Sequence, residues 1–173
     1  VAVSQARVIQ ASDVMTDPDV DPRLPRSAVY QCGRNGLRDN AFQPPFNAGL
    51  IVLCPGMLLA SRGGHAHSHN RELNSASNAW TLAHEAGHLI DYDRYPSVYQ
   101  NLKSCILQHF SSTVGSDDYM SELTGDYWAA ESTAVMLTSL EPRARLDFVK
   151  QNLAGLCGFE DDGESHPSAR LRI

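Results

Sequence analysis

The clearest hydrophobic pattern in the chain lies between residues 71 and 92. Apolar side chains recur there at the spacing of one helical face, and no proline interrupts the segment. These positions are Leu73, Ala76, Trp80, Ala83, Ala86 and Ile90. Such a period predicts an amphipathic helix that buries its apolar side. Gly87 would lie inside this helix, where glycine costs about 1 kcal/mol relative to alanine, so we expect a packing reason for it.

The rest of the chain divides into a β-rich first part and a helical second part. Short apolar runs predict strands at residues 1–9, 28–32 and Leu50–Leu53, and Pro44-Pro45 favours an extended segment at 40–43. Prolines and N-capping residues predict further helices at 55–60, 96–111, 116–140 and 142–156. We therefore predict one α+β domain over residues 1–173, with a small N-terminal sheet packed on a mainly helical core.

Composition limits the possible functions. The 173 residues are 42% apolar and 20% charged, which is typical of a soluble globular domain. The net charge is −6 and lysine and arginine form no block, which argues against nucleic acid as a partner. No apolar run approaches the ~20 residues of a transmembrane helix, so we expect no transmembrane segment.

Four cysteines stand far apart, at positions 32, 54, 105 and 157, without metal-ligand spacing. Four buried thiols in a cytosolic protein are one interpretation. An even, dispersed set favours two disulfides and an oxidising compartment. We predict Cys32–Cys54 and Cys105–Cys157, each within one half of the chain. The sequence starts at Val1 without a methionine or a signal-like apolar segment. We expect an extracytoplasmic protein, periplasmic or secreted, in its mature form after signal removal, although a chain trimmed for expression would start in the same way.

The predicted helix over 71–92 carries the motif His84-Glu85-Ala86-Gly87-His88. Residues four apart on a helix are neighbours, about one turn (~6 Å) apart. His84 and His88 can therefore bind one zinc ion, and Glu85 can reach a metal-bound water without being a ligand. The same five-residue pattern also arises by chance on surface helices, so the rest of the chain must supply a third ligand.

The candidates for that ligand are two histidines elsewhere in the chain and three acidic residues on the helix predicted after residue 116. They are His109, His166, Glu122, Asp126 and Glu131. Glu122 and Asp126 share a helical face, whereas Glu131 lies about half a turn from Glu122 at ~3.6 residues per turn. Glu122 as the ligand, with Asp126 as a hydrogen-bond partner of the site, makes a chemically complete arrangement. Alternatively, Glu122 and Asp126 form a solvated acidic face of the helix and bind no metal.

The order of HExxH and ExxxD, with Glu122 and Asp126 as the acidic residues, resembles the gluzincin pattern of thermolysin-like enzymes. Two further stretches narrow the resemblance: Asn40-Ala41-Phe42 before a predicted strand, and His166-Pro167 followed by Arg172. Together they are similar to the CAAX-prenyl-protease and heat-shock-protease family of zinc metallopeptidases. The resemblance covers about residues 40–173 and leaves residues 1–39 outside it.

This resemblance implies a role for each matching residue. His84, His88 and Glu122 would bind one catalytic Zn²⁺, with Glu85 as the general base. His166 would lie near the reacting carbonyl, and Arg172 would support the site together with Asp126. Asn40, Ala41 and Phe42 would form an exposed edge strand that pairs with the substrate backbone, so the active site would lie between this edge and the HExxH helix.

We therefore expect a zinc metalloendopeptidase that acts on extended or unfolded protein segments. The chain departs from the family in three ways: it lacks membrane helices, Gly125 replaces the usual alanine before Asp126, and only one residue follows Arg172.

Two alternatives stay open. Thr124-Gly125-Asp126 half-matches a motif of deuterolysin-type aspzincins, which would make Asp126 the third ligand. In the second alternative, the chain is a non-catalytic or latent zinc-stabilised binding module. The retained Glu85 argues against this, because a purely structural site does not need a general base. The loop with His65, His67 and His69 is a solvated loop, a second metal site or a plug for the cleft.

Overall fold

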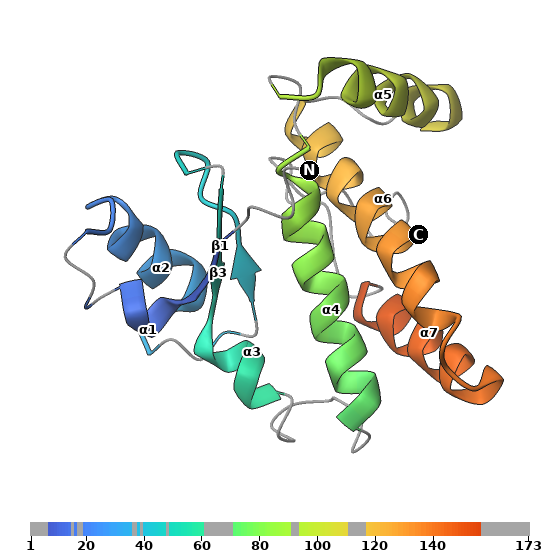
Figure 1. The fold of residues 1–173 in the computed structure, drawn as a ribbon, viewed down its shortest axis with the longest axis horizontal. Coiled ribbons are helices and arrows are strands. Elements are labelled where there is room, and N and C mark those ends of the chain that lie inside the picture. The colour runs from blue at the N-terminus through green and yellow to red at the C-terminus, as the bar shows by residue number, and fades with distance from the viewer. Residues whose placement is uncertain are drawn as a thin grey trace.

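The computed structural model describes residues 7–14, 16, 19–35, 38, 40–47, 49–60, 71–90, 94–110 and 117–156. They form the predicted α+β arrangement, with a small sheet in the N-terminal part and long helices after it (Figure 1). The helix α4 (Arg71–Gly87) stands between the sheet and α6 (Asp117–Leu137) and contacts both.

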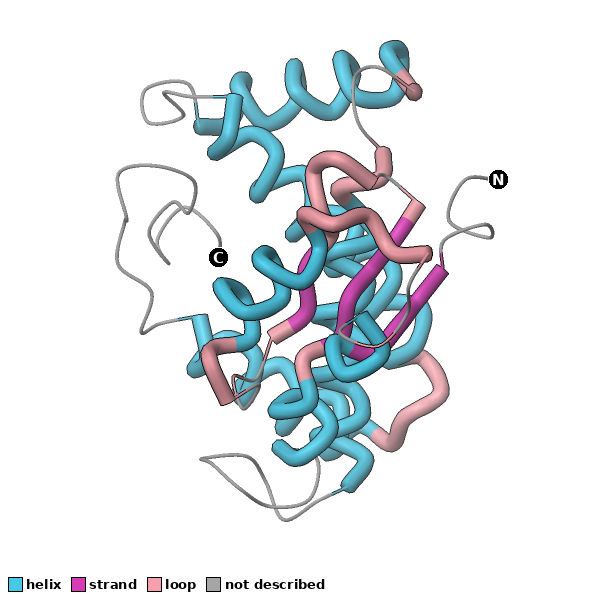
Figure 2. Tube along the Cα trace, turned by 90° about the vertical axis from the view of Figure 1, so that its left-hand side faces the viewer, coloured by secondary structure: helices cyan, strands magenta, loops and turns pink. Residues whose placement is uncertain are grey.

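The sheet has three strands in the order β1-β3-β2, which lie side by side in Figure 2. The central strand β3 (Leu50–Leu53) pairs in parallel with β1 (Arg7–Gln10) and antiparallel with β2 (Ala41–Phe42). The predicted strand over Leu50–Leu53 is confirmed. β2 is an edge strand, as expected.

Side chains of β3 alternate between two apolar layers, as the period of a strand requires. Leu50 and Val52 pack with the short helices α1 (Ala11–Val14) and α2 (Leu24–Cys32). Ile51 belongs to a second cluster that includes Leu82 and Ala86 of α4. The sheet is therefore covered on one face by α1 and α2 and on the other by α4.

The predicted strand over residues 28–32 is wrong, because these residues form the second half of α2. Pro25 lies in the first turn of this helix, where a missing backbone N–H leaves no hydrogen bond unmade. Leu24, Ala28 and Cys32 then recur every four residues and are all buried. This helical period, and not the β-rich composition of the segment, decides its structure.

The remaining helices agree with the predicted segments, with small differences at their ends. They are α3 (Pro55–Ala60), α5 (Pro96–Phe110) and α7 (Pro142–Leu156). α4 ends at Gly87, earlier than expected, and the next residues form tight turns with Leu89 N–H donating to Ala86 O. His88 therefore lies just beyond the helix. Within the described residues, no helix is long and apolar enough to cross a membrane.

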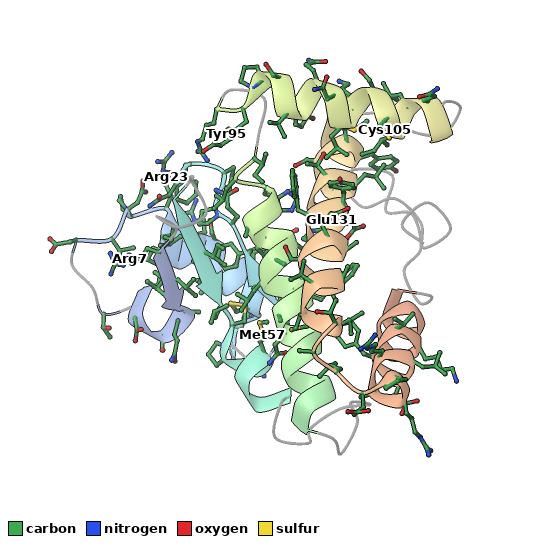
Figure 3. All side chains as sticks on the ribbon, turned by 45° about the vertical axis from the view of Figure 1, so that its right-hand side comes forward. Arg7, Arg23, Met57, Tyr95, Cys105 and Glu131 are labelled. Carbon is green, nitrogen blue, oxygen red and sulfur yellow. A yellow bond between two sulfur atoms is a disulfide. The ribbon has the colours of Figure 1, made fainter. Side chains whose placement is uncertain are left out.

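The cysteines follow the prediction only in part. Cys32 and Cys54 form a disulfide that joins the end of α2 to the residue after β3. The predicted Cys105–Cys157 bond is wrong, because Cys105 is a free cysteine exposed on α5 (Figure 3). α5 buries Leu102 and Ile106 against α6, which leaves the position between them on the outer face. Cys157 lies outside the described residues.

Candidate metal centre

The end of α4 and the beginning of α6 bring two imidazoles and one carboxylate together. His84 Nε2 lies 3.1 Å from His88 Nε2 and 3.2 Å from Glu122 Oε2. His88 Nε2 lies 3.7 Å from Glu122 Oε1. Within the described part of the chain, these three residues form the group that can hold a metal ion, with all ligand atoms within 4.8 Å of one another. The predicted ligand triad is thus brought together.

These separations fit a small tetrahedral cation. Ligand atoms about 2.05 Å from a tetrahedral zinc ion lie about 3.3 Å apart. The three distances between the ligand atoms, 3.1, 3.2 and 3.7 Å, lie on both sides of that value. Two histidine nitrogens and one carboxylate oxygen are also a donor set that zinc accepts. The residues present therefore fit a metal ion without rearrangement of either helix.

Each histidine is oriented through its other ring nitrogen. His84 Nδ1 lies 2.9 Å from Asp126 Oδ1, and His88 Nδ1 lies 3.1 Å from Ser121 Oγ. Such outer partners fix the ring and direct Nε2 to the metal. Asp126 contacts Nδ1 of His84, so it lies on the opposite side of the ring from the metal-binding Nε2. The scheme with Glu122 as ligand requires this position. Sequence reasoning missed Ser121, since a serine beside Glu122 on a helix carries no distinctive signal.

The surroundings of His84 favour the protonated form of its imidazole. Burial lowers the pKa of His84, but the hydrogen bonds to Asp126 and Glu122 outweigh this effect and raise the pKa to about 10. A protonated imidazole carries a hydrogen on both ring nitrogens and cannot offer Nε2 to a metal ion. Metal binding must displace this proton, so metal affinity falls as the pH is lowered.

Glu85 faces the sheet from the same turn of α4. Its Oε2 accepts a hydrogen bond of 2.9 Å from the backbone N–H of Gln43, the residue after β2. Burial raises the pKa of Glu85 to about 7, against the opposing charge of His84. The carboxylate is therefore anchored by one oxygen and sits in an environment that favours proton uptake near neutral pH.

The predicted edge strand is present but it is not exposed. Ala41 is 1% exposed because it packs in the cluster with residues of α4. Phe42 is 7% exposed because it packs on the other face of the sheet, in the cluster with α1 and α2. Asn40 directs its side chain away from α4, since its Nδ2 contacts Gln31 O at 3.5 Å and Gln31 Oε1 at 3.4 Å. The expectation of an exposed edge is thus corrected, and Asn40 contacts α2 in this structure.

Two glycines allow α4 and α6 to approach each other at the site. A Cβ atom on Gly87 would lie 2.9 Å from Gly125 Cα, and a Cβ atom on Gly125 would lie 2.9 Å from His84 Cε1 and 3.1 Å from His84 O. Gly87 therefore has the packing reason expected from its sequence context. Gly125 leaves no room for a Cβ atom because the His84 ring and backbone occupy that space.

Gly125→Ala should move His84 and weaken both the helix packing and metal binding. Overpacking of this kind typically destabilises a protein by about 1–3 kcal/mol. Thermal unfolding of the metal-free variant and zinc titration measure the two effects. Gly49→Ala is the matched control, because a Cβ atom there meets nothing within 4 Å. Equal melting temperatures and equal zinc affinities for the two variants would contradict this packing argument.

The other candidates are not among the side chains that the described part of the chain brings together here. Glu131, labelled in Figure 3, is exposed further along α6. The side chain of His109 is not described. His166, Arg172 and the loop with His65, His67 and His69 lie outside the described residues, so their roles stay predictions.

Comparisons with known proteins add no assignment to this geometry. Searches of protein-family models, curated proteins and solved structures find no match to the chain.

Proposed function

We propose that the protein is a zinc-dependent peptidase that hydrolyses extended or unfolded protein segments. The observation that carries this proposal is the convergence of His84, His88 and Glu122 at tetrahedral spacing, with Glu85 on the adjacent position of the same helix. A purely structural zinc site closes all four positions with protein ligands. Among the described residues, three side chains could bind the metal beside an acid–base carboxylate, which is typical of a hydrolytic site.

When bound, zinc would supply a Lewis acid for the scissile carbonyl and would make a bound water more acidic. His84, His88 and Glu122 would hold the ion, and Asp126 and Ser121 would keep the two imidazole rings in position. Because Glu85 Oε2 accepts the Gln43 N–H, Oε1 would take a proton from the attacking water and deliver it to the leaving amine nitrogen. General acid–base catalysis of this kind typically contributes ~10²–10⁴ in rate.

The substrate backbone would pair with β2. Asn40 O accepts the Cys54 N–H on the side of β3, whereas the Gln43 N–H points to Glu85. Backbone groups alternate along a strand, so the N–H and C=O of Ala41 point to the same side as Gln43. Pairing there recognises main chain and not side chains. Since Ala41 is buried, this pairing needs a local opening beside β2.

An extracytoplasmic location agrees with this function. The Cys32–Cys54 disulfide forms and persists in oxidising compartments. Under the same proposal, the resemblance assigns His166 to the neighbourhood of the reacting carbonyl and Arg172 to its support.

Metal removal and restoration test the proposed function. Chelation should abolish cleavage of unfolded casein, and one equivalent of zinc should restore it, because three side chains of the site would bind a single ion. Elemental analysis and a fluorescent casein assay measure the two quantities. Stoichiometric zinc without cleavage would instead favour a zinc-stabilised binding module, and a folded protein that binds no zinc would contradict both functions.

A further inference from the structure

We propose that the Cys32–Cys54 disulfide and the Asn40 side chain are positioning elements of the catalytic carboxylate. They fix β2 so that the Gln43 N–H remains on Glu85, and full turnover is therefore reached only by the oxidised protein. This inference rests on the proposed function, because it concerns the same carboxylate.

A single backbone hydrogen bond connects the disulfide to the segment whose Gln43 N–H contacts Glu85. Cys54 follows β3 directly, and its backbone N–H donates to Asn40 O at 3.0 Å. Asn40 begins the extended segment that contains β2. The covalent bond from Cys32 to Cys54 thus connects the end of α2 to the residue that holds the start of this segment.

The Asn40 side chain makes a second connection between the same parts of the molecule. Its Nδ2 contacts both oxygens of Gln31, the residue immediately before Cys32. The end of α2 is therefore joined to the beginning of β2 twice, once through the disulfide and Cys54 and once through Asn40. Neither connection involves a metal ligand.

β2 needs such support because it is very short. It pairs with β3 through Ala41↔Leu53 and Phe42↔Val52 and then leads directly into Gln43. A displacement at Asn40 is transmitted over three residues to the N–H that holds Glu85. Misplacement of a catalytic group by about 1 Å can lower a rate by about 10²-fold, so small movements of this strand matter.

Both cysteines of the disulfide are buried. Cys32 is 2% exposed and Cys54 is 0% exposed, and both belong to the core cluster that contains Leu24, Ala28 and Val52. A reductant in solvent does not reach these sulfur atoms in the folded protein. The bond therefore acts as a permanent part of the positioning apparatus and not as a rapid switch.

The test compares the double variant Cys32→Ala/Cys54→Ala with Phe148→Leu, both assayed as zinc-loaded protein well below their melting temperatures. Phe148 is buried in a separate cluster with Met136 and Leu137, so its truncation destabilises the fold without contact with β2. We expect the double variant to keep one zinc and its KM, and to lose up to about 10²-fold in kcat. Phe148→Leu should keep its kcat.

Amide hydrogen exchange at Gln43 supplies a readout that is independent of cleavage. The Gln43 N–H should exchange faster in the double variant than in the wild type and should be unchanged in Phe148→Leu. Unchanged exchange at Gln43 together with unchanged kcat would overturn the inference. If the wild type fails to cleave any substrate, the proposed function fails, while the exchange comparison still decides whether the disulfide positions this residue.

A second variant keeps the test decisive if the double variant does not fold. Asn40→Ala retains the disulfide and removes only the contact with Gln31. We expect faster exchange at Gln43 and a smaller loss of kcat in the same direction, with zinc content unchanged. An Asn40→Ala protein identical to the wild type in both measurements would remove Asn40 from the positioning elements.

Discussion

Glu85→Gln should reduce kcat by about 10²–10⁴-fold while the protein keeps its fold and its zinc. The amide has nearly the shape of the carboxylate, and its oxygen can still accept the Gln43 N–H that holds Glu85 Oε2. It cannot take the proton of the attacking water, so only the chemical step loses its base. Zinc remains bound because His84, His88 and Glu122 are unchanged. Steady-state kinetics and elemental analysis measure the two quantities.

The matched control for this prediction is Glu141→Gln. It makes the same chemical change at an exposed carboxylate just before α7, so it should leave kcat, KM and zinc content at their wild-type values. Near-normal activity in Glu85→Gln would show that another group acts as the base. Loss of zinc from Glu85→Gln would make Glu85 a ligand, which contradicts the assigned role.

Glu122→Ala should lose most of the bound zinc. This change removes one of three protein donors and leaves His84 Nε2 and His88 Nε2 facing each other at 3.1 Å. Asp126→Asn should weaken zinc affinity by only about 10–100-fold, because Asp126 contacts the outer nitrogen of His84. Competition with a chromophoric chelator ranks the two variants. The opposite order, with Asp126 indispensable and Glu122 tolerant, would select the aspzincin-like scheme.

The two histidines were predictable because their geometry is local. A helical turn places residues four apart on one face, so His84 and His88 were expected to converge before any tertiary contact was known. Glu122 was predictable for the weaker reason that it shares a helical face with Asp126. The distance between α4 and α6, however, depends on Gly87 and Gly125, and the sequence does not indicate which glycines meet.

The wrong or missing expectations have different physical causes. Ala28 and Cys32 were assigned to a strand from their β-rich neighbourhood, yet their four-residue spacing buries them as part of α2. Cys105 was paired by its place in the chain, but it lies on the outer face of α5. Ser121 was missed because its contact with His88 exists only after α4 and α6 have packed.

The division of the ligands between α4 and α6 has a consequence for how the protein acquires its metal. His84 and His88 precede α5 in the chain and Glu122 follows it, so the unfolded chain does not hold these three side chains together. Loading under the proposed function is then a late event that follows the docking of these helices.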